Sequence, residues 1–150
     1  MSEAIKILKN LYLEQNKSKC PSLPEYARST PKYKDTDTNS LTKCVKDFLA
    51  LKGIHVERTG SEGGVRHTKD GTYKRVFSSA MKGTSDLKAI INGKFVAIEI
   101  KCKATHDKQR EAQKKYQEQI EKSGGVYYIA TDFQSFYEWF TDFTSRASSQ

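Results

Sequence analysis

One dipeptide, Asn92-Gly93, lies between two apolar alternating runs in the second half of this 150-residue chain. Asn-Gly in that setting is the strongest short-range signal for a β-hairpin, and a two-residue loop fixes the register of the flanking strands. The sequence therefore predicts a tight hairpin in which two carboxylates face each other. Counting outward from the turn gives these cross-strand pairs: Ile90 with Phe95, Lys88 with Ala97, and Asp86 with Glu99.

The second strand of this hairpin has one apolar and one charged face, because successive side chains of a strand point to opposite sides. Opposed side chains lie about 4.5–5.5 Å apart at Cβ. The charges of Asp86 and Glu99 would then repel each other by about 3 kcal/mol at an effective dielectric near 20. The core-facing set is Val96, Ile98 and Ile100, and the opposite set is Ala97, Glu99 and Lys101.

A divalent cation would turn this repulsion into attraction. Mg²⁺ takes oxygen ligands, commonly one or two carboxylates with waters and substrate phosphate. Lys101 is placed to orient or deprotonate a water and to stabilise the charge of a phosphorane. The spacing therefore indicates a metal-dependent nuclease site. The alternative is an ordinary solvent-exposed hairpin face, on which Asp, Glu and Lys are also common.

The charge balance favours a polyanionic partner. The chain holds 26 Lys and Arg against 18 Asp and Glu, a formal charge of +8. A basic body with an acidic cleft suits a phosphate substrate and a metal ion. The alternative is a soluble basic protein with no such partner.

The cysteines favour a reducing compartment, because Cys20, Cys44 and Cys102 are odd in number and far apart. Cys102 and His106 could form half of a zinc site, but a second pair of ligands at a usual spacing is missing. No apolar run approaches the roughly 20 residues that span a bilayer, and the N-terminus has no signal-peptide pattern. We expect a soluble cytoplasmic protein with no membrane partner.

Periodicity predicts the following elements. A helix covers about residues 3–15, and the polar stretch 16–39 is a linker or surface arm. A second helix, capped by Asn39 or Ser40, ends at Gly53, and a strand covers 54–59. Residues 60–82 form a projecting basic hairpin, which either lies along a phosphate backbone or is a solvated loop.

The last third predicts a helix, a strand and a helix. Asp107 caps a helix that ends near residue 123, and 126–130 returns parallel to 95–101 through a right-handed crossover. Aromatic residues from Phe133 to Phe140 mark a closing helix. The predicted fold class is α/β, a small mixed sheet flanked by helices with an N-terminal helical arm. We expect the helix and arm over 1–38 and the core domain over 39–150.

Four segments follow one another along the chain: Gly83-Thr84-Ser85-Asp86-Leu87, Ala97-Ile98-Glu99-Ile100-Lys101, residues 107–116, and Gly124-Gly125-Val126-Tyr127-Tyr128. In this order they resemble the PD-(D/E)xK nuclease superfamily, and most closely its small phage-type VRR-NUC group. The resemblance covers about residues 39–140 and implies a restriction-endonuclease-like core. Ser85 stands where the family usually has Pro. The early helix Glu of many members has no counterpart, which leaves Glu57 or Glu62 as substitutes for a second metal.

The resemblance implies roles for individual residues. Asp86, Glu99 and the backbone carbonyl of Ile100 would bind Mg²⁺ or Mn²⁺, Lys101 would be the catalytic lysine, and Gln113 would face the site. Gln109 would lie one turn before Gln113 on the same side. The residues expected to supply DNA affinity without reading sequence are Lys74, Arg75, Lys82, Lys103, Gln109 and Arg110.

The expected function is a metal-dependent DNA endonuclease in a bacterial or phage-infected cell. Branched DNA such as a Holliday junction is one candidate substrate, and a homodimer is one candidate assembly. The alternative is a non-catalytic module on the same fold that binds nucleic acid or serves phage assembly.

Overall fold

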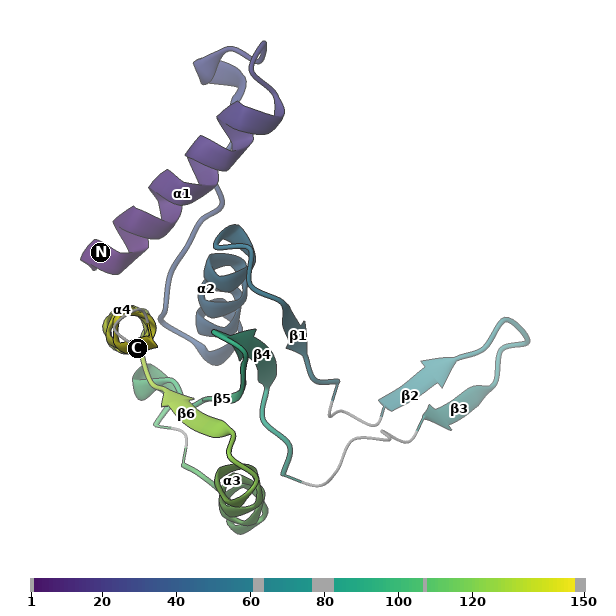
Figure 1. Ribbon diagram of the computed structural model, residues 1–150. Helices are drawn as coiled ribbons and strands as arrows, with labels where there is room; N and C mark the ends of the chain where they lie inside the picture. The colour runs from purple at the N-terminus through teal and green to yellow at the C-terminus, as the bar shows by residue number, and fades with distance from the viewer. Residues whose placement is uncertain (1, 61–63, 77–82, 107, 148–150) are drawn as a thin grey trace.

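In a computed structural model the chain forms a four-stranded mixed sheet with helices on both faces (Figure 1), which confirms the predicted mixed α/β class. The structure describes residues 2–60, 64–76, 83–106 and 108–147. The strand order is β1-β4-β5-β6, and β2 and β3 form a separate two-stranded sheet. The elements are α1 (Glu3–Lys19), η1 (Glu25–Ala27), α2 (Thr38–Leu51), β1 (Val56–Arg58), β2 (Gly64–His67), β3 (Tyr73–Val76), β4 (Leu87–Ile91), β5 (Lys94–Ile100), η2 (Lys103–Thr105), α3 (Glu111–Lys122), β6 (Val126–Ala130) and α4 (Phe133–Ala147).

The β4–β5 hairpin has the predicted register. Ile90 pairs with Phe95 and Lys88 with Ala97. Residues 92 and 93 both have positive φ, of 51° and 74°, as a type I′ turn requires. Since β4 begins one residue after Asp86, continuing this register places Asp86 opposite Glu99.

Strand β6 runs parallel to β5, with Val96 beside Val126 and Ile100 beside Ala130, and α3 forms the crossover as predicted. The predicted start of this helix was wrong. Residues 108–110 are not helical, and α3 begins at Glu111. The backbone N–H of Arg110 donates to Gln113 Oε1 at 2.8 Å, so the side chain of Gln113, in the first turn of α3, caps the N-terminus of that helix. Asp107 lies outside the described residues.

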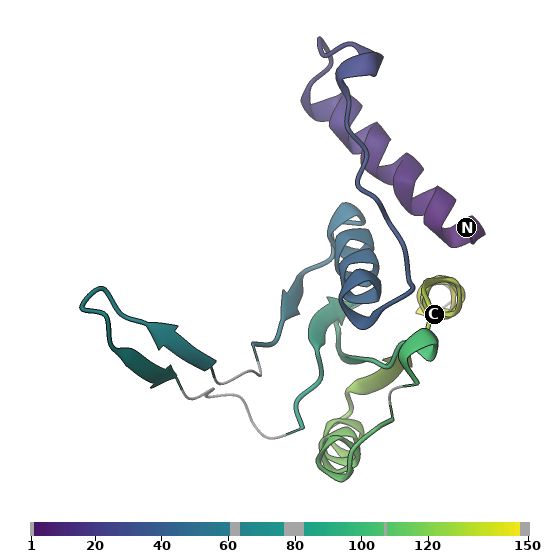
Figure 2. The same ribbon diagram turned by 180° about the vertical axis from the view of Figure 1, so that it is seen from behind.

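The larger core lies on the face covered by α2 and α4, and α1 packs against these two helices (Figure 2). Phe48 at its centre makes edge-to-face contacts with four aromatic rings of α4. Helix α1 joins this core through Ala4, Ile5 and Leu8. It continues to residue 19 rather than 15, because the polar residues that follow Gln15 remain compatible with an exposed helix.

The polar stretch before α2 is anchored at its end. Tyr33 is buried, and its hydroxyl donates to Asp47 Oδ2 at 3.1 Å. Asp37, rather than Asn39 or Ser40, caps α2 by accepting the Ser40 N–H at 2.9 Å. Asp carboxylates are strong N-caps, and this one lies one residue before the observed helix start. Most of the stretch is exposed, as expected of a surface arm, but these contacts fasten its end to α2.

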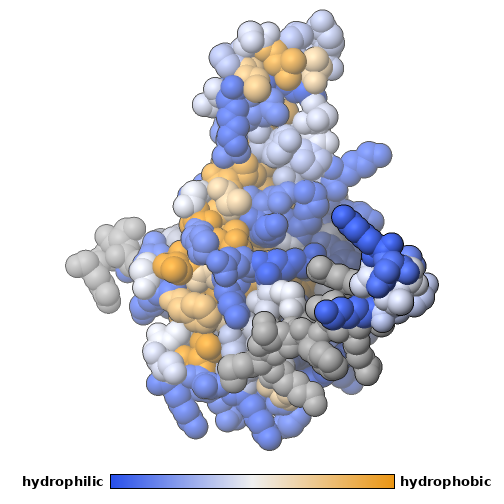
Figure 3. Space-filling view, turned by 90° about the vertical axis from the view of Figure 1, so that its right-hand side faces the viewer, coloured by the Kyte–Doolittle hydropathy of each residue, from blue (hydrophilic) through white to orange (hydrophobic). Residues whose placement is uncertain are grey.

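Strands β2 and β3 form a hairpin that projects from the body (Figures 1 and 2). Tyr73 and Lys74 are exposed, and the His67 and Tyr73 rings meet edge to face with their centroids 5.1 Å apart. Figure 3 views the molecule from the side on which the β2–β3 hairpin projects, and hydrophilic residues dominate the described part of the hairpin there. No helix in the described ranges is long and apolar enough to cross a membrane.

Candidate metal centre

Asp86 is positioned by a close backbone contact with α3. Gly83 has φ of +84°, and a Cβ at this position would lie 2.3 Å from the carbonyl oxygen of Ala112. Only glycine accepts both the left-handed conformation and the contact. The loop therefore packs on the first turn of α3 and leads directly into β4. The backbone N–H of Ile100 then donates to Asp86 Oδ2 at 2.9 Å, which ties the carboxylate to β5.

Glu99 is 1% exposed, on the sheet face that α3 covers. Its Oε1 accepts two hydrogen bonds, one from Lys101 Nζ at 3.0 Å and one from the side-chain amide of Gln113. Its Oε2 is also buried, but has no hydrogen-bond partner among the described residues. An unpaired buried carboxylate oxygen is costly, so this side of Glu99 could accept a further partner.

The surroundings of Glu99 disfavour its charged form. Burial is the main cause and the charge of Asp86 the second, and together they raise the pKa of Glu99 to about 7 despite the opposing effect of Lys101. A carboxylate close to another one is harder to ionise, because like charges repel. A cation bound between them would favour ionisation of both.

The donor set fits a hard divalent ion. Asp86 and Glu99 supply carboxylate oxygens, and Glu99 Oε2 is the unpartnered one. In a regular strand the N–H and C=O of one residue point to the same side, so the Ile100 carbonyl faces the side of Asp86 as its N–H does. Mg²⁺ commonly binds through one or two carboxylates and fills its remaining positions with water and phosphate. The described residues hold no group of three acidic, His or Cys side chains that could form a fuller cage.

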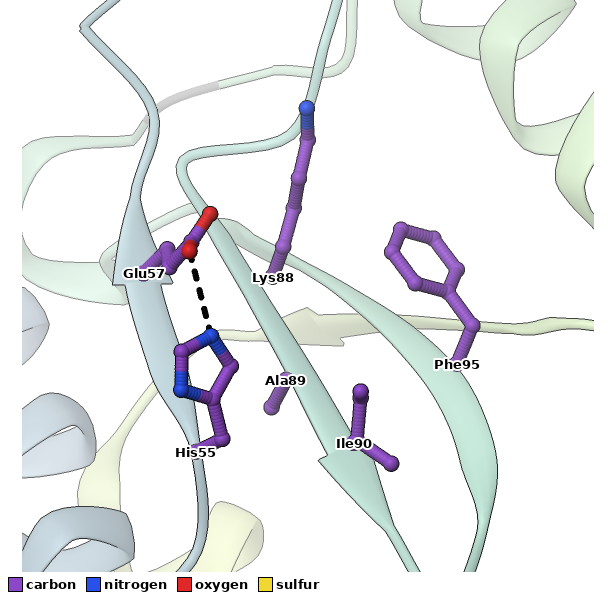
Figure 4. Close-up of a pocket in the computed structure, with 6 residues that line it drawn as sticks. All are labelled: His55, Glu57, Lys88, Ala89, Ile90 and Phe95. Atoms are coloured by element: carbon purple, nitrogen blue, oxygen red, sulfur yellow. Dashed lines mark hydrogen bonds and ion pairs between the residues drawn. The ribbon is translucent and has the colours of Figure 1, made fainter.

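The open part of the same sheet face does not add a third acid to this pair. Glu57 of β1 lies beside Lys88 of β4 in the register, but its carboxylate pairs with His55 at 3.1 Å. Figure 4 shows this ion pair with Ile90 and Phe95 on the uncovered strands, and Lys88 extending toward the start of β4. Glu62, the other substitute considered, lies outside the described residues.

The structure brings the five central predicted residues together, since Asp86, Glu99, Ile100, Lys101 and Gln113 are linked by the contacts above. Gln113 has two roles, because the side chain that caps α3 also donates to Glu99.

The predicted DNA-binding residues are spread more widely. Lys103 and Gln109 line a pocket beside Lys101, and Arg110 is exposed just before α3. Gln109 precedes the helix instead of lying one turn before Gln113 within it, so that expectation was wrong. Lys74 lies on the projecting hairpin. The side chain of Arg75 and the whole of Lys82 lie outside what the structure describes.

Three further residues, His106, Lys108 and Thr131, line the same pocket as Lys101. Lys108 and Thr131 were not selected from the sequence, and His106 was considered only as a zinc ligand. A signal for them was available, because ligands of open α/β sheets bind beyond the carboxyl ends of the strands. Residues 101–103 follow β5 and Thr131 follows β6, its parallel neighbour.

A comparison of the chain with protein-family models and with curated proteins found no match in either.

Proposed function

We propose that this chain is a divalent-metal-dependent nuclease that hydrolyses DNA phosphodiester bonds. The observation that carries the proposal is the pairing of Asp86 with a buried Glu99, one oxygen of which has no partner in the described structure. Lys101 lies 3.0 Å from the other oxygen. A fold gains no stability from two such carboxylates, whereas a metal-dependent hydrolase needs them.

Mg²⁺ or Mn²⁺, when bound by Asp86, Glu99 and the Ile100 carbonyl, would supply a Lewis acid and an acidified water. The protein residues have separate tasks. Gln113 and the Ile100 N–H fix the orientation of the two carboxylates. Lys101, with a side chain 14% exposed, is mostly enclosed and can face the reacting phosphate. Its ammonium group then stabilises the negative charge that develops on the phosphoryl oxygens, and it orients the attacking water.

The charge of the chain supports DNA as the substrate. A formal charge of +8 and exposed basic residues such as Lys74, Lys103 and Arg110 favour binding through the phosphate backbone. These contacts position the polymer without reading its sequence, so a substrate recognised by shape, such as branched DNA, is consistent with them. We extend the proposal to a four-way junction substrate and a homodimer as features to be tested.

The test is cleavage of supercoiled plasmid and of a four-way junction, each with Mg²⁺, Mn²⁺ or EDTA. We expect wild type to cut with metal and not with EDTA. Lys101→Ala should lower the cleavage rate by about 10²–10³-fold, because it removes one positioned cation from the charged transition state. Lys46→Ala is the matched control, since Lys46 is exposed on α2, across the sheet from the site.

Two further readouts separate the outcomes. Mn²⁺ titration of Lys101→Ala should still show binding, because the carboxylates remain. Gel filtration with light scattering reports the oligomeric state. If wild type binds DNA but cuts neither substrate with either metal, the proposal is wrong and the chain is a non-catalytic nucleic-acid-binding module.

A further inference from the structure

A pocket of 380 Å³ opens beside Lys101, at the end of the sheet where β5 and β6 finish. These two strands are parallel, and the carboxyl ends of parallel strands are where open α/β sheets bind ligands. The volume lies in the range typical of small-ligand pockets. The pocket is lined by Lys101, Cys102, Lys103, His106, Lys108, Gln109, Ile129 and Thr131.

Among the described residues the lining is basic and contains no carboxylate. Two of its three lysines have nearby anions, since Lys101 pairs with Glu99 and Lys103 with Asp132 at 2.6 Å. Lys108 is exposed and has no ion-pair partner in the described part of the chain. The imidazole of His106 adds a hydrogen-bond donor, while the Thr131 hydroxyl already donates to Asp132 Oδ2 at 3.3 Å. Such a set suits an anion with several acceptor oxygens.

The pocket shares Lys101 with the metal centre, so an anion within it would lie next to the reacting phosphate. A single nucleic-acid strand carries such neighbouring anions, because its phosphates follow one another along the backbone. Lysine suits this role as a mobile point charge. Ile129, which is half-buried, offers an apolar surface to the sugar between two phosphates.

We propose that this pocket binds a phosphate group of the substrate strand adjacent to the one that is cleaved, with Lys108 and His106 as its principal contacts. This inference rests on the proposed nuclease function, because the metal centre defines which phosphate is cleaved. The phosphate has two sources, an internal diester or the monoester at a strand end. The chemistry of the pocket is the same for both.

The test measures DNA binding in EDTA, where no strand is cut, by fluorescence anisotropy over a series of salt concentrations. The variants are Lys108→Gln, His106→Gln and, as a charge-matched control, Lys46→Gln on the far side of the sheet. We expect Lys108→Gln to weaken binding roughly five- to tenfold. It should also reduce the slope of log affinity against log salt by about 0.7–0.9, the value for one lost phosphate contact. His106→Gln should weaken binding with a smaller change of slope.

Oligonucleotides with a 5′-phosphate, a 3′-phosphate or hydroxyl ends identify the source. If the effect of Lys108→Gln appears only with one phosphorylated end, the pocket binds a terminal monoester. If the effect is equal for all three, the pocket binds an internal diester. Either result supports the inference.

The inference is overturned if Lys108→Gln and His106→Gln match the Lys46→Gln control in both affinity and slope, or if wild type does not bind DNA. Because this assay is independent of hydrolysis, its failure is distinguishable from failure of the nuclease proposal. A protein that binds through Lys108 but never cuts would retain the pocket and lose the proposed function. A protein that cuts DNA while its Lys108→Gln variant binds DNA normally would retain the proposed function and overturn the inference about the pocket.

Discussion

The two faces of the four-stranded sheet are built from the same strands but differ in what they bury. One face meets α2 and α4, against which α1 packs, in a continuous apolar and aromatic core around Phe48. The other meets α3 alone, through a small cluster of Ala97, Tyr116 and Tyr127 next to the buried Glu99. Residues that alternate along β5 therefore have two different roles. The first face stabilises the fold, and the second holds a costly acidic group in a fixed place.

The comparison teaches that β5 needs a strong core on one side to tolerate a charged site on the other. A buried carboxylate with an unpaired oxygen destabilises the protein by a few kcal/mol. Burial of large apolar side chains contributes about 1.5–3 kcal/mol each. A core that contains Phe48, Phe133 and Phe136, all fully buried, exceeds that cost.

The largest effect should come from emptying the first face. Phe48→Ala removes a buried ring that contacts four others. We expect the free energy of unfolding to fall by about 3–5 kcal/mol, the usual cost of such a cavity. Urea denaturation followed by tyrosine and tryptophan fluorescence measures it. A loss below about 1 kcal/mol would show that this core is not the main source of stability.

The second face should respond in the opposite direction. Glu99→Gln removes the charge that burial and Asp86 disfavour. We expect the metal-free protein to gain about 1–2 kcal/mol of unfolding free energy at pH 8, because the raised pKa means that folding disfavours the charged form of Glu99 even with Lys101 beside it. Metal-dependent cleavage should fall at least about 100-fold.

Glu57→Gln is the matched control for this substitution, because Glu57 is an exposed acid on the same sheet face. Its effect on stability should stay within about 0.5 kcal/mol. A loss of stability in Glu99→Gln, with the control unchanged, would contradict a destabilising role for the Glu99 charge.

The smallest effect concerns Asp132, which links the two faces. Its carboxylate accepts the Ser135 N–H at 2.8 Å at the start of α4 and binds Lys103 of the proposed phosphate pocket. Burial raises the pKa of Asp132, but hydrogen bonds from Lys103 and Ser135 outweigh this and lower it to about 2, from an ordinary value of 3.8.

A lowered folded-state pKa gives stability that is complete above about pH 4 and lost as the pH falls toward 2. Asp132→Asn should therefore cost about 1 kcal/mol at pH 6, and the difference from wild type should vanish near pH 2. Denaturation curves over this range measure it, with Asp142→Asn as the control because Asp142 lies exposed on the same helix. A difference that persists at pH 2 would show that the lost contact is not ionic.

The β4–β5 hairpin shows how far local sequence reaches. The Asn-Gly turn predicted its register, and with it the meeting of Asp86 and Glu99, because turn geometry and side-chain alternation are local properties. The start of α3 and the cap of α2 were predicted incorrectly. Several candidate capping residues lie near each helix start. The residues that cap do so through local contacts, Asp37 with the Ser40 N–H and Gln113 with the Arg110 N–H.

The sequence by itself determined a basic chain, a tight hairpin and the alternation that places an acid and a lysine on one strand face. Only the tertiary structure decided that Glu99 is buried with one oxygen unpaired among the described residues, and that Gln113 both caps α3 and holds that acid. It also decided that Gly83 lies against α3 and that a basic pocket opens where two parallel strands end. The physical reason is that burial and partner choice depend on residues far apart along the chain, whereas turns and strand faces depend on neighbours.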